Sequence, residues 1–261
     1  MKTVVLICAL FGIYTVICAF LYVIQDRLLY FPPGELDQPG AHALRLTCGD
    51  ATLRIWELHP EAHDALIYFG GNGERVGANL PDFDAAFPDR AVYLVNYRGF
   101  DGSTGRPSES ALISDAQCIY DWAAARHPRI VAIGRSLGSA VATALAASRP
   151  IERLILVTPF DSIANVAANS LPWVPVRWLL RDHFDSAARI VKVTLPVLII
   201  VAEHDEVISR RRSDALIAAT PPGARQVVVI AGAMHNDIHL SPVYLPTLKG
   251  FLATQPLPAR N

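Results

Sequence analysis

Seven short apolar runs, separated by longer stretches of helical character, limit the fold of this chain more than any other feature. The runs are residues 52–58, 65–69, 91–96, 130–133, 154–158, 197–201 and 226–230. Several of them, such as 197–201, are apolar without interruption, which is typical of strands buried on both faces of a parallel sheet. Helices are expected between the runs, at residues 108–126, 139–148, 210–219 and 243–253. This alternation predicts an α/β fold in which a mostly parallel central sheet is flanked by helices.

The N-terminus carries an apolar run, residues 3–24, that contains no charged side chain. As a helix its 22 residues would be ~33 Å long, enough to cross the ~30 Å hydrocarbon core of a bilayer. A cleaved signal peptide is the alternative, but such peptides have an apolar stretch of about 7–15 residues and a small-x-small cleavage site. Here the run is longer, and Ile17 stands where a small residue is needed before Cys18 and Ala19. We therefore expect a single-pass membrane anchor in residues 1–27 and one further domain in residues 28–261.

The charges around this run bear on its orientation. Lys2 and the α-amino group precede it, whereas Asp26 and Arg27 nearly cancel each other after it. The positive-inside rule then favours a cytoplasmic N-terminus and an extracytoplasmic main domain, by a margin of about one charge. Beyond the anchor the chain contains Cys48 and Cys118, which are compatible with one disulfide or with two buried thiols.

The overall composition excludes two classes of protein. The chain has 23 Lys and Arg against 24 Asp and Glu, a net charge of −1, whereas nucleic-acid-binding domains normally carry a strong basic excess. A hydrophobic content of 52% excludes intrinsic disorder. The stretch 164–190 interrupts the alternation of strands and helices, and it contains Trp173, Trp178 and two prolines. We expect this stretch to form a short cap between two strands.

A Gly-x-Ser-x-Gly sequence, residues 134–138, directly follows the apolar run at 130–133 and precedes an Ala-rich helical stretch. In this order the pattern is typical of a nucleophile elbow, a tight strand-to-helix turn that holds a serine hydroxyl clear of the sheet. The glycines let the strand and the helix pass closely, and the helix N-terminus faces the place where an oxyanion would develop. Ser136 is therefore the predicted nucleophile, and a tight turn with an incidental serine is the alternative.

A serine hydroxyl needs a base to remove its proton, and the elbow predicts an acid and then a histidine farther along the chain. Both residue types follow later strands: Asp205 comes after the sixth apolar run, and His235 comes after the seventh. We predict Asp205 as the acid and His235 as the base. Glu203 on the same loop as Asp205, and Asp161 after the preceding strand, are alternatives for the acid.

His235 and His239 are spaced like the histidine pair of a zinc protease. That chemistry needs a glutamate after the first histidine, where this chain has Asn236, and no third ligand is evident in the sequence. We therefore expect no metal and no other cofactor.

Acyl transfer also needs a second backbone N–H donor, which usually comes from the loop after an early strand. Residues 67–69 end such a strand, and they enter the glycine-rich turn 70–73. We predict that the backbone N–H groups of Asn72 and Leu137 form the oxyanion hole. An ordinary glycine turn is the alternative.

In their order along the chain, these segments resemble those of the α/β-hydrolase superfamily. The resemblance rests on the apolar run with residues 26–32 after it, the glycine turn, residues 96–103, the elbow, Pro196 with Asp205, and His235 with the two residues that follow it. Within the superfamily, the chain is similar to small membrane-anchored serine hydrolases related to the depalmitoylases and lysophospholipases. That family usually has a histidine before the glycine of the oxyanion turn. Here Gly70 takes its place, which puts the packing of the loop in question.

The resemblance implies an α/β-hydrolase fold and a serine hydrolase that cleaves carboxylic esters or thioesters. A fold does not identify a substrate, so the substrate class has to come from the site. The expected substrate is a small-molecule or lipid-like acyl compound, and the anchor and the tryptophans of the cap suggest a lipid-like one near a bilayer. A serine peptidase with the same mechanism and a non-catalytic, membrane-tethered scaffold are the alternative hypotheses.

Overall fold

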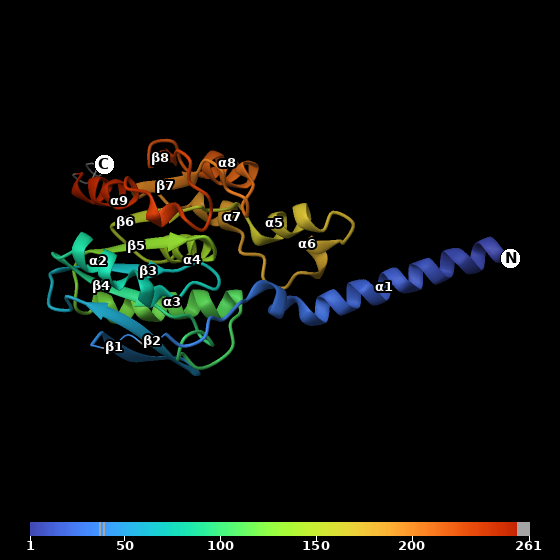
Figure 1. Ribbon diagram of the computed structural model, residues 1–261, viewed down its shortest axis with the longest axis horizontal. Coiled ribbons are helices and arrows are strands. Elements are labelled where there is room, and N and C mark those ends of the chain that lie inside the picture. The colour runs from blue at the N-terminus through green and yellow to red at the C-terminus, as the bar shows by residue number, and fades with distance from the viewer. Residues whose placement is uncertain (37, 39, 255–261) are drawn as a thin grey trace.

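In the residues that the computed structural model describes, 1–36, 38 and 40–254, a sheet of eight strands forms the centre of the molecule (Figure 1). The strands are β1 His42–Cys48, β2 Ala51–Leu58, β3 Asp64–Phe69, β4 Arg90–Val95, β5 Ile130–Arg135, β6 Arg153–Val157, β7 Val197–Ala202 and β8 Arg225–Ile230. Their order across the sheet is β1-β2-β4-β3-β5-β6-β7-β8. β2 pairs antiparallel with β1 and β4, and all the other pairs are parallel, which confirms the predicted mostly parallel sheet. Residues 255–261 of the predicted main domain lie outside the described part of the chain.

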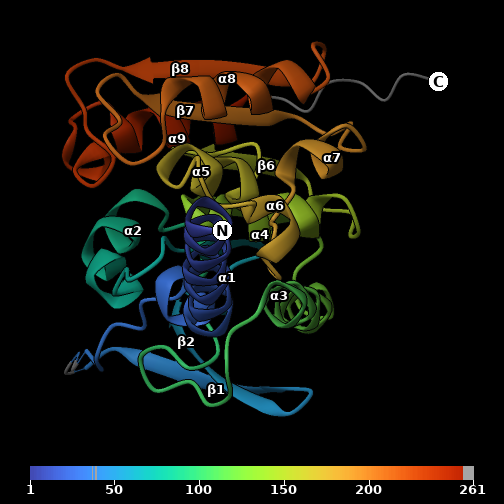
Figure 2. The same cartoon turned by 90° about the vertical axis from the view of Figure 1, so that its right-hand side faces the viewer.

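Helices cover both faces of the sheet. Along β3, Ala65, Ile67 and Phe69 pack toward one face, and Leu66 and Tyr68 pack toward the other. The helices on the first face are α3 Glu109–Ala124, α4 Leu137–Ala146, α7 Ser186–Ile190 and α8 Arg210–Ala219, and those on the second are α2 Leu80–Ala86 and α9 Tyr244–Ala253. Figure 2 shows α2 and α3 on opposite sides of the sheet. Burial of both faces explains why the strand sequences are apolar without alternation.

The predicted strands and helices all form, and each of their ends lies within two residues of the predicted one. β1 and α2 are among the elements that the sequence does not predict. β1 is an edge strand whose residues are mostly exposed or half-buried, so it shows no clear apolar pattern. α2 has only seven residues, too few for a helical period to be recognised.

α1 (Lys2–Leu29) leaves the domain as a long helix and places the N-terminus far from the sheet (Figure 1). Its most apolar part has a mean hydropathy of 2.7, so by length and composition α1 can cross a membrane, and a signal sequence has the same properties. The helix continues past Arg27, where the predicted anchor ends. Extended backbone at Tyr30 ends it, ahead of Pro32 and Pro33.

The segment between β6 and β7 contains α5 (Ile163–Ser170) and α6 (Val176–Leu179), which we call the cap helices, followed by α7. This is the stretch in which the sequence predicts a cap. The cap helices lie beside the end of α1 that is nearer the sheet, as both views show (Figures 1 and 2). Cys18 of α1 packs there with Val174 and Val176 in a small apolar cluster.

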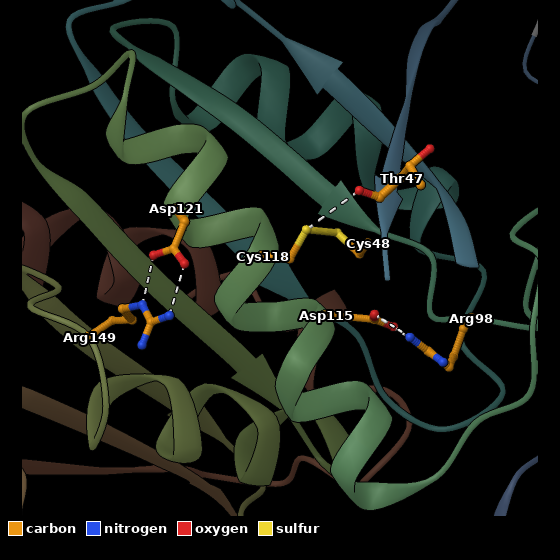
Figure 3. The surroundings of a disulfide bond; sticks show 7 residues. All are labelled: Thr47, Cys48, Arg98, Asp115, Cys118, Asp121 and Arg149. Atoms are coloured by element: carbon orange, nitrogen blue, oxygen red, sulfur yellow. Dashed lines mark hydrogen bonds and ion pairs between the residues drawn. A yellow bond between two sulfur atoms is a disulfide. The ribbon is translucent and has the colours of Figure 1, made fainter. Parts of the chain in front are cut away.

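A disulfide joins Cys48, the last residue of β1, to Cys118 in α3 (Figure 3). The two cysteines are 70 residues apart in sequence, so the bond ties the edge strand to a distant helix. The Arg98 guanidinium makes two hydrogen bonds to Asp115 of the same helix, at 2.6 and 2.7 Å. The sequence is compatible with either a disulfide or two buried thiols, and the structure contains the disulfide.

Candidate active site

Ser136 lies in the turn between β5 and α4, at the carboxyl end of the parallel strands. Its backbone has φ 50° and ψ −115°, a conformation that a residue with a side chain rarely adopts. A Cβ atom added at Gly134 would overlap the carbonyl of Gly138, and one added at Gly138 would overlap the carbonyl of Phe69. Both glycines are therefore required by the close approach of α4 to β5 and β3.

Ser136, His235 and Asp205 form a continuous chain of hydrogen bonds. Ser136 Oγ lies 3.0 Å from Nε2 of His235, and Nδ1 of His235 lies 2.9 and 3.0 Å from the two carboxylate oxygens of Asp205. The His235 and Asp205 side chains are only 5% and 3% exposed. Asp205 also accepts hydrogen bonds from the N–H groups of Val207 and Ile208, at 3.0 and 2.6 Å, which orient its carboxylate. The structure thus brings together the predicted serine, acid and histidine from the ends of three strands.

The alternative acids have other partners. Asp161 pairs with the Arg212 guanidinium at 3.0 Å. Glu203 accepts a hydrogen bond from the Gly232 N–H at 2.8 Å. Among the described residues, neither carboxylate forms a hydrogen bond with the ring of His235.

Two further acids hold the loop that carries His235. Glu206 accepts a hydrogen bond from the His235 N–H at 2.9 Å, and Asp237 accepts one from the Met234 N–H at 2.7 Å. The backbone that leads into His235 is therefore held by side chains rather than by a strand or helix.

A small polar pocket opens beside Ser136. It is lined by Gly71, Asn72, Gly73, Glu74, Arg135, Ser136, His235 and Asn236. The Asn72 side chain is already engaged, because its Nδ2 donates to the Leu29 carbonyl at 2.7 Å and its Oδ1 accepts from the Phe31 N–H at 3.0 Å. The backbone N–H groups of Asn72 and of Leu137, the first residue of α4, form no hydrogen bond with another described residue. Both N–H groups therefore remain without a partner in the described part of the chain, and Asn72 lines the pocket.

Glu74 explains how the glycine turn keeps its shape without the histidine that the family usually has. A Cβ atom at Gly70 would overlap the Val76 side chain, so this position has no room for a larger residue. The Glu74 carboxylate instead accepts hydrogen bonds from the Gly71 N–H at 2.6 Å and from the Tyr68 hydroxyl at 2.7 Å. These hydrogen bonds hold the glycine turn in place, so its packing does not depend on a side chain at position 70.

Arg135 joins this turn to the loop of His235. Its guanidinium lies 3.2 Å from the Glu74 carboxylate and donates to the carbonyl oxygens of His235 and Asn236, each at 3.1 Å. Burial alone would raise the pKa of the Glu74 carboxyl, but the Arg135 charge and the hydrogen bonds from Gly71, Tyr68 and Asn79 together hold this pKa below its ordinary value. Burial by itself would lower the pKa of the Arg135 guanidinium. The negative charge of Glu74 is the main opposing effect, and the pKa of Arg135 is raised above its ordinary value.

Sequence reasoning missed Glu74 and Arg135 as parts of the site. The signal was present, since a charged residue stands directly before the elbow serine and an acid directly follows the glycine turn. Either residue alone has the pattern of an exposed surface charge. Only the parallel pairing of β3 with β5 brings the two loops together and buries the pair.

Comparison with known proteins agrees with this fold. A family model described as "alpha/beta hydrolase fold" matches residues 65–195, half of the chain. The chain is 42% identical to the uncharacterized protein Rv2307c of Mycobacterium tuberculosis over 168 residues, which are 62% of this chain and 59% of that protein. It therefore spans less than two thirds of the length of that relative. It is 28% identical to protein bem46 of Schizosaccharomyces pombe over 262 residues, covering 90% of this chain and 87% of the relative.

A solved structure shares the architecture at low sequence identity. The esterase Pf2001 of Pyrococcus furiosus matches with a TM-score of 0.70 and 15% identity, covering 85% of this chain and 96% of that one. At this identity the likeness concerns the fold. With the family match, the sheet order and the tight serine turn, it shows that this chain belongs to the α/β-hydrolase fold family.

Proposed function

We propose that this protein is a serine hydrolase that cleaves carboxylic ester or thioester bonds through an acyl-enzyme. The observation that carries the proposal is the chain of hydrogen bonds from Ser136 through His235 to Asp205. With Nδ1–H donating to the buried carboxylate, Nε2 holds the lone pair that faces the serine hydroxyl. The same carboxylate stabilises the imidazolium that forms when His235 takes up a proton.

The reaction has two halves. In the first, Ser136 Oγ bonds to the acyl carbon while its proton passes to Nε2 of His235. The bond to the leaving group then breaks, and the alcohol or thiol departs with that proton. In the second half, water gives a proton to His235 as its oxygen attacks the acyl-enzyme. The carboxylic acid leaves, and the proton returns to Ser136.

The oxyanion of each tetrahedral intermediate would be held by the backbone N–H groups of Asn72 and Leu137. Their lack of partners among the described residues supports this role, as does the position of Leu137 at the positive end of the α4 dipole. Loss of one such donor typically costs about 10²–10³ in rate.

Lipid-like acyl compounds are the proposed substrates. α1 and the cap helices place apolar surface beside the site, and Trp173 and Trp178 are 53% and 90% exposed there. Exposed tryptophans next to an apolar helix are typical of a protein at the membrane interface. Peptide hydrolysis would use the same residues, so an amide substrate belongs in the same assay.

We also propose that α1 stays attached as a single-pass anchor and that the catalytic domain is extracytoplasmic. The Gln25 side chain supports retention, since it donates to the Leu179 carbonyl at 3.3 Å and accepts from the Arg181 N–H at 2.8 Å. The disulfide supports an oxidising compartment. An N-terminal tag should remain on the membrane-bound protein, and a C-terminal tag should be digested in vesicles with the extracytoplasmic face outward. Loss of the N-terminal tag would contradict retention of α1. Protection of the C-terminal tag from digestion would contradict an extracytoplasmic catalytic domain.

The deciding experiment is labelling of the detergent-solubilised protein with a fluorophosphonate probe. The wild type and a Ser170→Ala control, altered at an exposed serine of α5, should label, whereas Ser136→Ala and His235→Ala should not. Labelled protein is then assayed with ester, thioester and peptide substrates. A folded wild type that does not react with the probe would contradict the proposal and favour the scaffold hypothesis.

A further inference from the structure

An apolar cleft separates α1 from the cap helices. Its walls include Leu21, Leu28 and Leu29 on the side of α1, and Ala167 and Leu171 on the side of the cap. These are hydrocarbon side chains, so the cleft is suited to a hydrocarbon and not to a polar ligand.

Gln25 also lines this cleft, but its amide is satisfied within the protein. Its Nε2 donates to the carbonyl of Tyr22 at 2.7 Å and to that of Leu179 at 3.3 Å, and its Oε1 accepts from the Arg181 N–H at 2.8 Å. The side chain therefore ties α1 to the end of the cap helices, with its amide nitrogen and oxygen both engaged within the protein.

The inner end of the cleft adjoins the catalytic pocket. Leu29 lines the cleft, and its carbonyl oxygen accepts the hydrogen bond from Asn72 Nδ2 at 2.7 Å. Asn72 in turn lines the pocket beside Ser136. One side-chain contact thus separates the apolar cleft from the turn proposed to hold the oxyanion.

A second contact joins the cap to α1 nearer the N-terminus of this helix. The Tyr14 hydroxyl donates a hydrogen bond to the Trp173 carbonyl at 3.0 Å, which ties the cap to α1 at a position 11 residues before Gln25. From residue 14 to residue 25 an α-helix rises about 16 Å, half of the ~30 Å hydrocarbon core. If α1 spans a bilayer, the cap helices therefore reach into the leaflet on the side of the domain. Trp173 and Trp178 then contact lipid.

We propose that the cleft between α1 and the cap helices binds the hydrocarbon chain of the acyl group, which enters directly from the leaflet that surrounds α1. The inference rests on the proposed function, because it assigns the place of the chain of the same substrate. One wall of the cleft is the anchor itself, so the chain moves from lipid to protein without passing through water. The carbonyl carbon is then presented at the inner end of the cleft, next to the pocket that Ser136 and Asn72 line.

The test compares p-nitrophenyl palmitate with p-nitrophenyl butyrate, using the full-length protein in phosphatidylcholine nanodiscs. Ala167→Phe fills the cleft, and Ala168→Phe makes the same change on the same helix at a half-buried position outside the cleft. The ratio of kcat/KM for palmitate to that for butyrate should fall at least tenfold in Ala167→Phe and stay within twofold of wild type in Ala168→Phe. An unchanged ratio in an Ala167→Phe protein that still hydrolyses butyrate overturns the inference.

A second measurement does not depend on turnover or on the folding of that variant. Ser136→Ala protein in the same nanodiscs is irradiated with palmitic acid that carries a diazirine in the middle of its chain, and the labelled peptides are identified. Label in both the peptide of Leu28 and that of Leu171 is expected, and label confined to the outer face of α1 overturns the inference. If neither ester is hydrolysed and the fluorophosphonate does not react, the proposed function fails, and the photolabelling still reports on the cleft by itself.

Discussion

The guanidinium of Arg135 donates a hydrogen bond to the backbone carbonyl of His235 at 3.1 Å, so the residue before Ser136 holds the loop that carries His235. The same guanidinium pairs with Glu74, which closes the glycine turn. One buried arginine therefore connects three parts of the site: the elbow, the histidine loop and the proposed oxyanion turn. Its role is positioning, since it contacts the backbone and a carboxylate and not the reacting atoms.

Replacement of Arg135 by lysine should lower kcat about tenfold or more with little change in KM, because a misplaced catalytic group costs up to about a hundredfold per ångström. The lysine keeps the charge but has no planar fork to reach Glu74 and two carbonyl groups together. The measurement is steady-state hydrolysis of p-nitrophenyl butyrate. Arg149→Lys, in an exposed pair with Asp121, serves as the control and should behave as wild type. Equal kcat values for the two variants would contradict the positioning role.

Glu74→Gln should lower the free energy of unfolding at pH 7 by about 3 kcal/mol, because it leaves Arg135 buried without its counter-charge. The pKa of Glu74 is held below its ordinary value of about 4.5, so its charge stabilises the fold above that pH. As the pH falls below about 4.5, the unfolded chain takes up a proton at Glu74 before the folded protein does, so the stabilisation decreases. It is lost once the pH has fallen through the lowered pKa and the folded protein is protonated at Glu74 as well. Urea unfolding of wild type and variant should therefore differ most at pH 7 and converge under acid conditions. A stability difference between wild type and variant that grows toward low pH would contradict a lowered pKa of Glu74 in the folded protein.

Gly70→Ala should destabilise the protein by about 1–3 kcal/mol and lower activity. The added Cβ overlaps the Val76 side chain, which has to move together with the proposed oxyanion turn. Val76→Ala makes room, so the double variant should be more stable than the sum of the two single changes predicts. Thermal unfolding of the four proteins gives this coupling energy. Strict additivity would show that the two positions do not compete for space.

Removal of the disulfide by Cys48→Ala with Cys118→Ala should lower the free energy of unfolding by about 4 kcal/mol, from loop-closure entropy over the 70-residue separation. Treatment of the wild type with dithiothreitol should have the same effect, measured as the shift in urea midpoint. Cys8→Ala, at an exposed free cysteine of α1, is the control and should leave the midpoint unchanged with and without reductant. A wild type that is insensitive to dithiothreitol, with both thiols free to alkylation, would contradict the disulfide.

Particular residues show where prediction from sequence ended. Ser136, Asp205 and His235 were predictable because each follows an apolar strand, and parallel strands end at one edge of a sheet. The role of Glu74 was not predictable, because its partner Arg135 is distant in sequence and becomes a neighbour only when β3 pairs with β5. The same holds for the cleft, since no local pattern says that residues 163–180 pack on the last turns of α1.

By itself, therefore, the sequence determined what depends on short-range patterns. Hydrophobic periodicity defined the strands and helices, glycine spacing defined the elbow, and an uncharged run defined a helix long enough to span a membrane. The tertiary structure alone decided that Cys48 meets Cys118, that Arg135 lies buried between Glu74 and His235, and that α1 forms one wall of an apolar cleft. Each of these depends on which distant segments become neighbours, and that is decided by the packing free energy of the whole domain rather than by any local stretch of the chain.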